Sequence, residues 1–329
     1  MTSVLELRRT AALRRAAVRA TFAPSVHNTQ PWRFVLRDGE LGVYADRSRR
    51  LEVLDPTSRQ LTISCGSALM NARVSLASSG FGAKVDRLPD SAHSDLLARI
   101  TTTDQPDTSA GFAALDSVLE LRQTNRRRFD DEQVPAEVLS ALEETAAAEH
   151  STLFVVSREE HRVAVARLTR TADVLENADP AYRAEIRAWT TDDPGRRDGV
   201  RELAVPYLDG LIQDEVPLRV FDIGGMGSPP PGPHSTRSQC LVVLGTEGDR
   251  PIDWLRAGEA LERTLLEITK RGFAAGPVTQ AVEVPSTRIQ LRAELGLTMY
   301  PQMLLRIGRA PLSPAARRRR LVDVLVEDA

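Results

Sequence analysis

The chain reads Ala23-Pro24-Ser25-Val26-His27-Asn28-Thr29-Gln30-Pro31-Trp32-Arg33-Phe34 between a helical pattern and a strand pattern. Pro24 and Pro31 fix the backbone φ near the two ends of this stretch. Ser25 and Asn28 have short polar side chains that bond nearby backbone groups and hold an irregular turn open. Residue types alone leave two interpretations, an ordinary helix-to-strand turn or a loop shaped to contact a ligand.

The residues around this loop predict the elements of a first half. Asp38-Gly39 between two alternating runs, 32–36 and 41–45, is a strong hairpin signal. A helix opened by Asp55-Pro56 and closed by Gly80 is apolar or small on most sides, so we expect it to be a central buried helix. The other predicted elements of this half are a helix over 4–22, strands over 83–88 and 96–103, and a polar linker over 101–109.

The later part of the chain predicts a second set of helices and strands. An arginine-rich turn, Arg122 to Phe129, follows a short helical pattern and precedes a helix that Pro135 opens. The predicted helices cover 112–121, 135–149, 158–175, 182–189, 253–271 and a stretch from Pro285, and the predicted strands cover 153–157, 240–245 and 303–307. The glycine- and proline-rich stretch 221–236 is either a surface loop or a lid.

The composition is that of a globular protein without a global charge preference. The 329 residues are 42% hydrophobic and 27% charged, and the net charge of −2 draws the chain neither to nucleic acid nor to a membrane surface. No apolar run approaches the roughly 20 residues that span a bilayer, and no leader peptide is visible. Cys65 and Cys240 are too few for a disulfide framework and fit a reducing cytoplasm. Scattered histidines predict no metal site.

The string Pro24-Ser25-x-x-Asn28-x-Gln30-Pro31-Trp32-x-Phe34 resembles the flavin-contacting loop of the FMN-dependent nitroreductase superfamily. The longer form, with Val26, His27 and Thr29, resembles the Acg branch, whose members carry two related halves in one chain. This resemblance implies an α+β nitroreductase-like fold with mixed sheets surrounded by helices. It also implies two pseudo-symmetric halves that mimic the usual homodimer.

The two halves show complementary losses. The second half keeps the arginine-rich turn but has Ala147-Ala148-Glu149-His150-Ser151 where the family carries its loop, whereas the first half keeps the loop and lacks the turn. Nitroreductases usually build each flavin site from two chains. We therefore expect one complete FMN site per chain, between a first half over 1–105 and a second half over 106–329. Such an internal pair is compatible with a monomer.

The resemblance and the chemistry of FMN together name the candidate cofactor-binding residues. A phosphate of about −2 charge needs fixed cations, and the planar fork of arginine suits it. The phosphate candidates are Arg122, Arg126, Arg318 and Arg319, with Thr124 and Asn125 as neutral donors, Arg127 and Arg128 as alternatives to Arg126, and the choice among 317–320 open. The family resemblance adds Pro24, Ser25 and Asn28 from the loop, and Pro277, Thr279 and Gln280 from a turn that lies against the isoalloxazine edge.

Two functions follow from the resemblance. The first is an NAD(P)H-dependent oxidoreductase that passes a hydride through flavin N5 to an electron-poor acceptor, such as a nitro compound or a quinone. The second is a non-catalytic protein that sequesters FMN beneath the 221–236 lid. A flavin-dependent dehydrogenase of one dedicated metabolite is a third interpretation. The exchange requires no catalytic side chain, and His27 is as well suited to ordering the loop as to chemistry.

Overall fold

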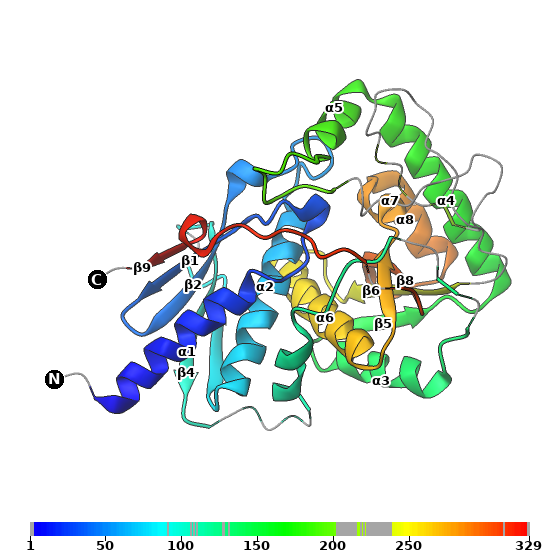
Figure 1. The fold of residues 1–329 in the computed structure, drawn as a ribbon. Coiled ribbons are helices and arrows are strands. Elements are labelled where there is room, and N and C mark those ends of the chain that lie inside the picture. Colours follow the sequence, from blue (N-terminus) through cyan, green and yellow to red (C-terminus); the bar gives the residue numbers. More distant parts are fainter. Residues whose placement is uncertain are drawn as a thin grey trace.

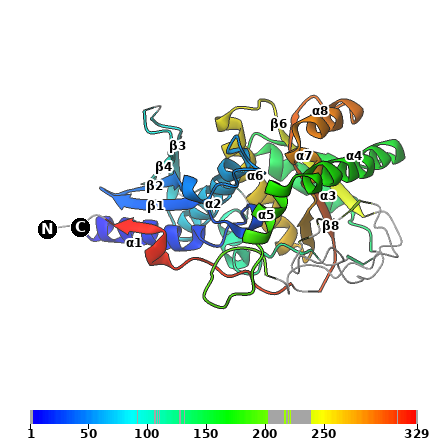
Figure 2. The same cartoon turned by 90° about the horizontal axis from the view of Figure 1, so that it is seen from above.

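The computed structural model places two β-sheets on either side of a pair of crossed central helices (Figures 1 and 2). The structure describes residues 3–90, 92–105, 107, 109, 111–126, 129–130, 132–201, 216–217, 219, 221, 239–311 and 313–327. The predicted lid over 221–236 lies outside the described residues except for Phe221, and so do Arg127 and Arg128.

The first sheet has the order β3-β4-β2-β1-β9. Its strands are β1 (Trp32–Arg37), β2 (Glu40–Ala45), β3 (Gly82–Arg87), β4 (Leu96–Thr103) and β9 (Leu325–Glu327). β1 and β2 form the predicted hairpin, and its turn residues Asp38 and Gly39 have φ of 51° and 74°. Only β9 runs parallel to its neighbour, with Phe34 of β1 opposite Leu325. The sequence did not predict this C-terminal strand.

The second sheet has the order β5-β6-β8-β7 and is antiparallel throughout. Its strands are β5 (Thr152–Val155), β6 (Cys240–Thr246), β7 (Ala274–Pro277) and β8 (Tyr300–Gly308). β6 and β8 lie in the middle of the sheet, and all but the first residue of each is buried. This burial explains why both read as apolar runs in the sequence instead of alternating patterns.

The central helices α2 (Arg59–Ser78) and α6 (Pro251–Lys270) cross at two glycines. A Cβ atom added to Gly66 would lie 2.9 Å from the Cα of Gly258 and 2.1 Å from the carbonyl oxygen of Leu255. The Ser67 hydroxyl donates to the Gly258 carbonyl at 3.0 Å across the same contact. Eighteen of the 20 residues of α2 are buried, which confirms the predicted central helix. It begins at Arg59, after Ser58 in the left-handed region, and not at the predicted Pro56.

One of the remaining helices packs beside α2 against the first sheet, one packs beside α6 against the second sheet, and most of the others cover the opposite face of the second sheet (Figure 1). They are α1 (Val4–Ala20), α3 (Ala136–Ala147), α4 (Glu159–Ala178), α5 (Pro180–Ala188), α7 (Gln280–Glu283) and α8 (Pro285–Glu294). Short 3₁₀ turns occupy Val26–Asn28, Arg47–Arg49, Ala113–Val118 and Leu321–Asp323. The predicted helix over 112–121 is therefore wrong in type, because this stretch forms only a 3₁₀ turn around the buried Phe112 and Leu115.

The C-terminal segment crosses from one sheet to the other. After β8 it runs along the front of the central helices in Figure 1 and ends as β9 beside β1. Residues of the predicted second half thus complete the sheet of the first half. This path brings the basic stretch 317–320 next to the loop that precedes β1.

Candidate functional site

The loop before β1 has an unusual backbone. His27 and Asn28 in its 3₁₀ turn have φ of 46° and 55°, and Gln30 just after the turn has φ of 51°. Left-handed backbone at a residue other than glycine costs about 1–3 kcal/mol and persists only where the surroundings enforce it. The Ser25 hydroxyl accepts from the Gln30 amide at 2.9 Å, and the Ser64 hydroxyl of α2 accepts from the Val26 amide at 3.3 Å. The loop is therefore a fixed, shaped element and not an ordinary turn.

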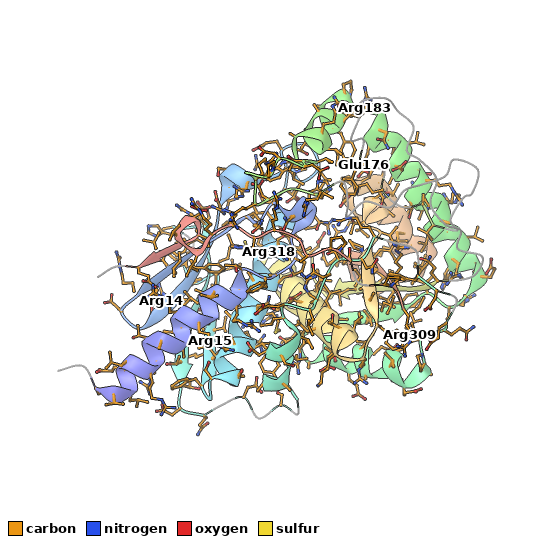
Figure 3. The ribbon with its side chains drawn as sticks, viewed as in Figure 1. Arg14, Arg15, Glu176, Arg183, Arg309 and Arg318 are labelled. Carbon is orange, nitrogen blue, oxygen red and sulfur yellow. The ribbon has the colours of Figure 1, made fainter. Side chains whose placement is uncertain are left out.

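The C-terminal segment holds this loop from the other side. Arg319 donates to the carbonyls of Gln30 and Trp32 at 3.1 and 3.3 Å, and its amide donates to the Gln30 side chain at 2.8 Å. Arg318 donates to Asn28 Oδ1 and to the Phe22 carbonyl, both at 3.0 Å. Figure 3 shows Arg318 near the middle of the molecule, where the segment passes the central helices.

Beside the loop lies a cavity with two adjoining compartments. The inner compartment encloses about 980 Å³ of atom-free space and the outer one about 590 Å³. Both are lined by Pro24, Ser25, Arg122, Gln123, Thr124 and Arg126. The loop of the first half and the arginine-rich turn of the second half thus share one cavity.

The inner compartment is mostly apolar and lies between the central helices and the second sheet. Its apolar walls are Ile63, Leu261, Leu265, Ala275, Met303 and Leu305. Pro277 and Thr279 lie at the end of β7 and border the same compartment. A flat apolar group suits this lining, since small-molecule sites are lined mainly by hydrophobic side chains with a few polar groups.

The outer compartment is the cationic end of the cavity. Arg318 and Asn28 line it, together with Gly199, Val200, Arg201 and residues 314–316. Burial and the charge of Arg122 lower the pKa of Arg318 to about 9, because Glu262 offsets them only in part. Burial and the charge of Arg219 likewise lower the pKa of Arg126 to about 10. Desolvation and a neighbouring positive charge disfavour the charged form of each arginine, and such a cluster is typical of a site for an anionic ligand.

Few acidic groups neutralise these arginines. Arg122 Nε lies 3.4 Å from the buried Glu262 Oε1, and burial raises the pKa of that carboxyl to about 7. Among the described residues, no carboxylate forms an ion pair with Arg126 or Arg318. The cavity therefore carries an excess of positive charge at neutral pH.

The structure brings together nine of the twelve predicted site residues. Seven line the inner compartment, namely Pro24, Ser25, Arg122, Thr124, Arg126, Pro277 and Thr279, and Asn28 and Arg318 line the outer one. Arg319 lines neither, because its guanidinium holds the loop. Asn125 is turned away and donates to the Pro311 carbonyl at 2.9 Å, and Gln280 is buried within α7.

Several lining residues were not predicted from the sequence. Gln60, Ser64 and Ser67 of α2 face the inner compartment, as do Arg219 and Phe221. The serines are visible as small polar residues in an otherwise apolar helix, but that pattern is equally typical of close helix packing. His27 is buried, and this burial with the nearby Arg219 and Arg126 holds its pKa well below the usual range, so its ring is neutral.

Among the residues that the structure describes, no helix combines the length and the apolar character needed to cross a bilayer. The same residues contain no group of three or more histidine, cysteine, aspartate or glutamate side chains that could hold a metal ion.

Comparison with known proteins shows the family of this chain. No family model matches the sequence. A Mycobacterium tuberculosis protein named "Putative NAD(P)H nitroreductase" is 34% identical over 319 residues, which cover 93% of this chain and 88% of that protein. A second protein from the same organism, with acg added to the same name, is 29% identical over 305 residues. The match covers 92% of this chain and 91% of that protein. The fold and the site together define an α+β protein with a positively charged ligand cavity. The chain belongs to the nitroreductase family, which confirms the predicted resemblance and fold class.

Solved structures of nitroreductases overlap the chain only loosely. A protein from Anabaena variabilis, described as a "putative nitroreductase", is 11% identical with a TM-score of 0.48, and the match covers 94% of this chain and 90% of that one. The FMN-dependent nitroreductase NfnB from Mycobacterium smegmatis, solved with NADPH, is 19% identical with a TM-score of 0.36, covering 64% and 96%.

Proposed function

We propose that the chain binds one FMN in the two-compartment cavity and acts as an NAD(P)H-dependent oxidoreductase of nitroreductase type. The observation that carries this proposal is the joining of an apolar slot to a cationic end between the loop and the arginine-rich turn. FMN has the same two parts, a flat ring and a phosphate. The acceptors would be electron-poor small molecules such as nitro compounds or quinones.

The cationic end would hold the phosphate. Arg122, Arg126 and Arg318 line this end, and a guanidinium can bond two phosphate oxygens at once. Thr124 and Asn28 add neutral polar groups beside them. An incoming phosphate would be attracted to these cations and would also reduce the repulsion among them, and both effects would favour binding.

The apolar compartment would hold the ring. Ile63 and Ser67 of α2 and Leu265 of α6 form walls that exclude water, and Pro277 and Thr279 would border the ring edge. Bound FMN would supply two-electron hydride chemistry, and the chain would supply position and electrostatics. The described residues place no proton-transferring histidine there, since His27 is neutral and buried.

An internal duplication with a single surviving site is part of the proposal. Four strands recur in the same spatial order, β3-β4-β2-β1 in one sheet and β7-β8-β6-β5 in the other. Each sheet packs on a central helix of 20 residues, and Gly66 and Gly258 are each the eighth residue of their helix. These correspondences support two related halves, with boundaries near 105 and 106.

The same correspondence explains why only one site remains. Ser67 and Leu265 line the cavity as the ninth residue of α2 and the fifteenth of α6. Their counterparts are Glu259 and Arg73, which form an ion pair at 2.8 Å where the second cavity would lie. Glu149, in the segment that replaces the loop, pairs with Arg73 at 2.7 Å. Charged side chains therefore fill the place of the second ring, which supports a binding stoichiometry of one.

A protein that sequesters FMN without turnover is the second candidate function. Phe221, at the start of the predicted lid, is buried within the inner compartment. Arg126 lies over its ring at 5.3 Å, and His27 meets it edge-on at 5.6 Å. A side chain in this position favours restricted access to the ring face.

Anaerobic reduction tests the oxidoreductase against the sequestering protein. We expect purified protein to hold one FMN per chain and to lose the visible absorption of oxidised flavin rapidly when NADPH or NADH is added. Free FMN under the same conditions is the control. Persistent colour with full occupancy would favour sequestration, whereas two FMN per chain would contradict the single site.

The proposed compartment is the cytoplasm. Cys65 and Cys240 are both free thiols, as a reducing compartment allows. The proposed partners are FMN, NAD(P)H and the acceptor, with no nucleic acid or membrane. The internal pair of halves also supports a monomer.

A further inference from the structure

A second hollow, which we name the outer groove, lies behind one wall of the inner compartment. It encloses about 1620 Å³ of atom-free space between residues 53–60, the end of α4 and helix α8. Leu175 and Ile289 on its rim are 49% and 71% exposed, so the groove is open to solvent. Gln60 and Glu283 line both the groove and the inner compartment and form the partition between them.

A pair of carboxyl groups spans this partition. Glu176 of α4 and Glu283 of α7 both contact Arg219, and they lie close enough together for a hydrogen bond between their carboxyl groups when one of them is protonated. Glu176 and Tyr182 line the groove, and the Tyr182 hydroxyl donates to Glu176 Oε2 at 3.0 Å. Figure 3 shows Glu176 on α4, close to α5. Tyr182, Glu176 and Glu283 therefore form a chain of polar side chains from the groove to the inner compartment.

Other charged groups around the pair fix its protonation. Arg219 contacts Glu283 and Tyr182 and lies 3.5 Å from Glu176 Oε2. Arg59 of α2 lies within electrostatic range of Glu283, and Asp173 of α4 lies within electrostatic range of Arg219. Burial raises the pKa of Glu176 to about 8, with Glu283 acting in the same direction and Arg219 in the opposite one. Glu176 thus holds its proton at neutral pH.

A donor without a partner points to a ligand at the same wall. Gln60 is 4% exposed, and its Nε2 has no hydrogen-bond partner among the described residues. A buried amide left unpaired is unfavourable unless a ligand accepts its hydrogen bond. A molecule in the inner compartment beside Gln60 would also be within reach of Glu283.

We propose that Glu176 and Glu283 carry protons from the outer groove to an acceptor bound in the inner compartment. The inference rests on the proposed function, because it supplies the proton that acceptor reduction consumes. A quinone becomes a hydroquinone by gaining one hydride, which flavin chemistry supplies, and one proton. Glu176 passes its proton to the Glu283 carboxylate, Glu283 gives this proton to the acceptor oxygen, and groove water reprotonates Glu176. Hydride transfer from NAD(P)H to the flavin requires none of these steps.

Glu176→Gln tests the relay, because glutamine keeps the hydrogen bonds but releases no proton. The holoprotein is reduced with dithionite without oxygen and mixed with a quinone, and flavin reoxidation is followed by stopped flow. We expect the variant to reoxidise at least about tenfold more slowly at neutral pH, since proton transfer by a positioned group contributes about 10²–10⁴-fold. The wild-type reoxidation rate should fall as the pH rises past about 8, whereas the rate of the variant should show no such decrease. Equal rates and equal pH profiles would overturn the proposal.

Asp179→Asn is the matched control. Asp179 lines the same groove but caps α5 by accepting from the Ala181 amide at 2.8 Å, and asparagine caps equally well. We expect its reoxidation rate to remain within about twofold of wild type. An equal loss in both variants would show a general disturbance of the groove and overturn the relay.

Stability of the apoprotein gives a readout independent of flavin. The folded pKa of Glu176 lies above its unfolded value, so the folded chain binds more protons between about pH 4.5 and pH 8. Wild-type stability should therefore fall across this window relative to Glu176→Gln. Parallel curves of unfolding free energy against pH for the two proteins would contradict a proton bound to Glu176 at neutral pH. Failure to bind FMN would contradict the proposed function. FMN binding together with parallel curves of stability against pH and equal flavin reoxidation rates would contradict only the relay.

Discussion

Arg126→Ala is expected to weaken FMN binding about ten- to hundredfold, because a charge-assisted hydrogen bond contributes about 1.5–3 kcal/mol and about 1.4 kcal/mol is tenfold. Arg318→Ala should have a similar effect. Both residues line the outer compartment, and burial lowers the pKa of each. Titration of apoprotein with FMN, followed by flavin fluorescence, measures the change in Kd.

The same variants separate binding from folding. Because Arg126 is a half-buried cation without a carboxylate partner among the described residues, its removal should leave the thermal midpoint of the apoprotein unchanged or higher. Arg320→Ala is the control, since Arg320 is exposed and pairs with Asp323 at 2.9 Å. Arg319→Ala should also lower FMN occupancy, but by loosening the loop and with a lower midpoint. Unchanged FMN affinity in both Arg126→Ala and Arg318→Ala would contradict the phosphate site.

Gly66→Ala is expected to destabilise the chain by about 2 kcal/mol. Alanine in place of glycine improves helix propensity by about 1 kcal/mol, whereas overpacking of a core costs about 1–3 kcal/mol and backbone overlap lies at the upper end. The added Cβ would lie 2.1 Å from the Leu255 carbonyl oxygen, so α2 and α6 must separate. Denaturant unfolding of the apoprotein measures the loss.

The helix separation should also reach the cavity. Ile63 and Ser67 on one helix and Leu261 on the other form its inner walls, so FMN affinity should fall with stability. Gly195→Ala is the control, because Gly195 lies exposed in a turn where the nearest atom to an added Cβ is the Asp193 side chain at 3.2 Å. A Gly66→Ala protein as stable as wild type would contradict the close crossing of α2 and α6.

Local patterns determined most of the elements. The Asp38-Gly39 turn, the buried helix before Gly80 and the apolar run of β6 were predicted close to their observed ends. Hairpin chemistry and hydrophobic periodicity are short-range signals, so they survive in a single sequence. The helix expected over 112–121 failed because packing of Phe112 and Leu115 against the central helices stabilises a 3₁₀ turn there instead.

The sequence by itself determined the loop at Pro24 to Asn28, the arginine-rich turn and the family to which they belong. Only the tertiary structure decided that Arg318 faces the cavity while Arg319 holds the loop, and that Glu176 and Glu283 share Arg219 behind the cavity. Arg318 and its partner Asn28 are 290 residues apart in the chain. Contacts of that kind depend on how helices and sheets pack, and no local pattern of residues encodes which side chain of a basic run turns inward.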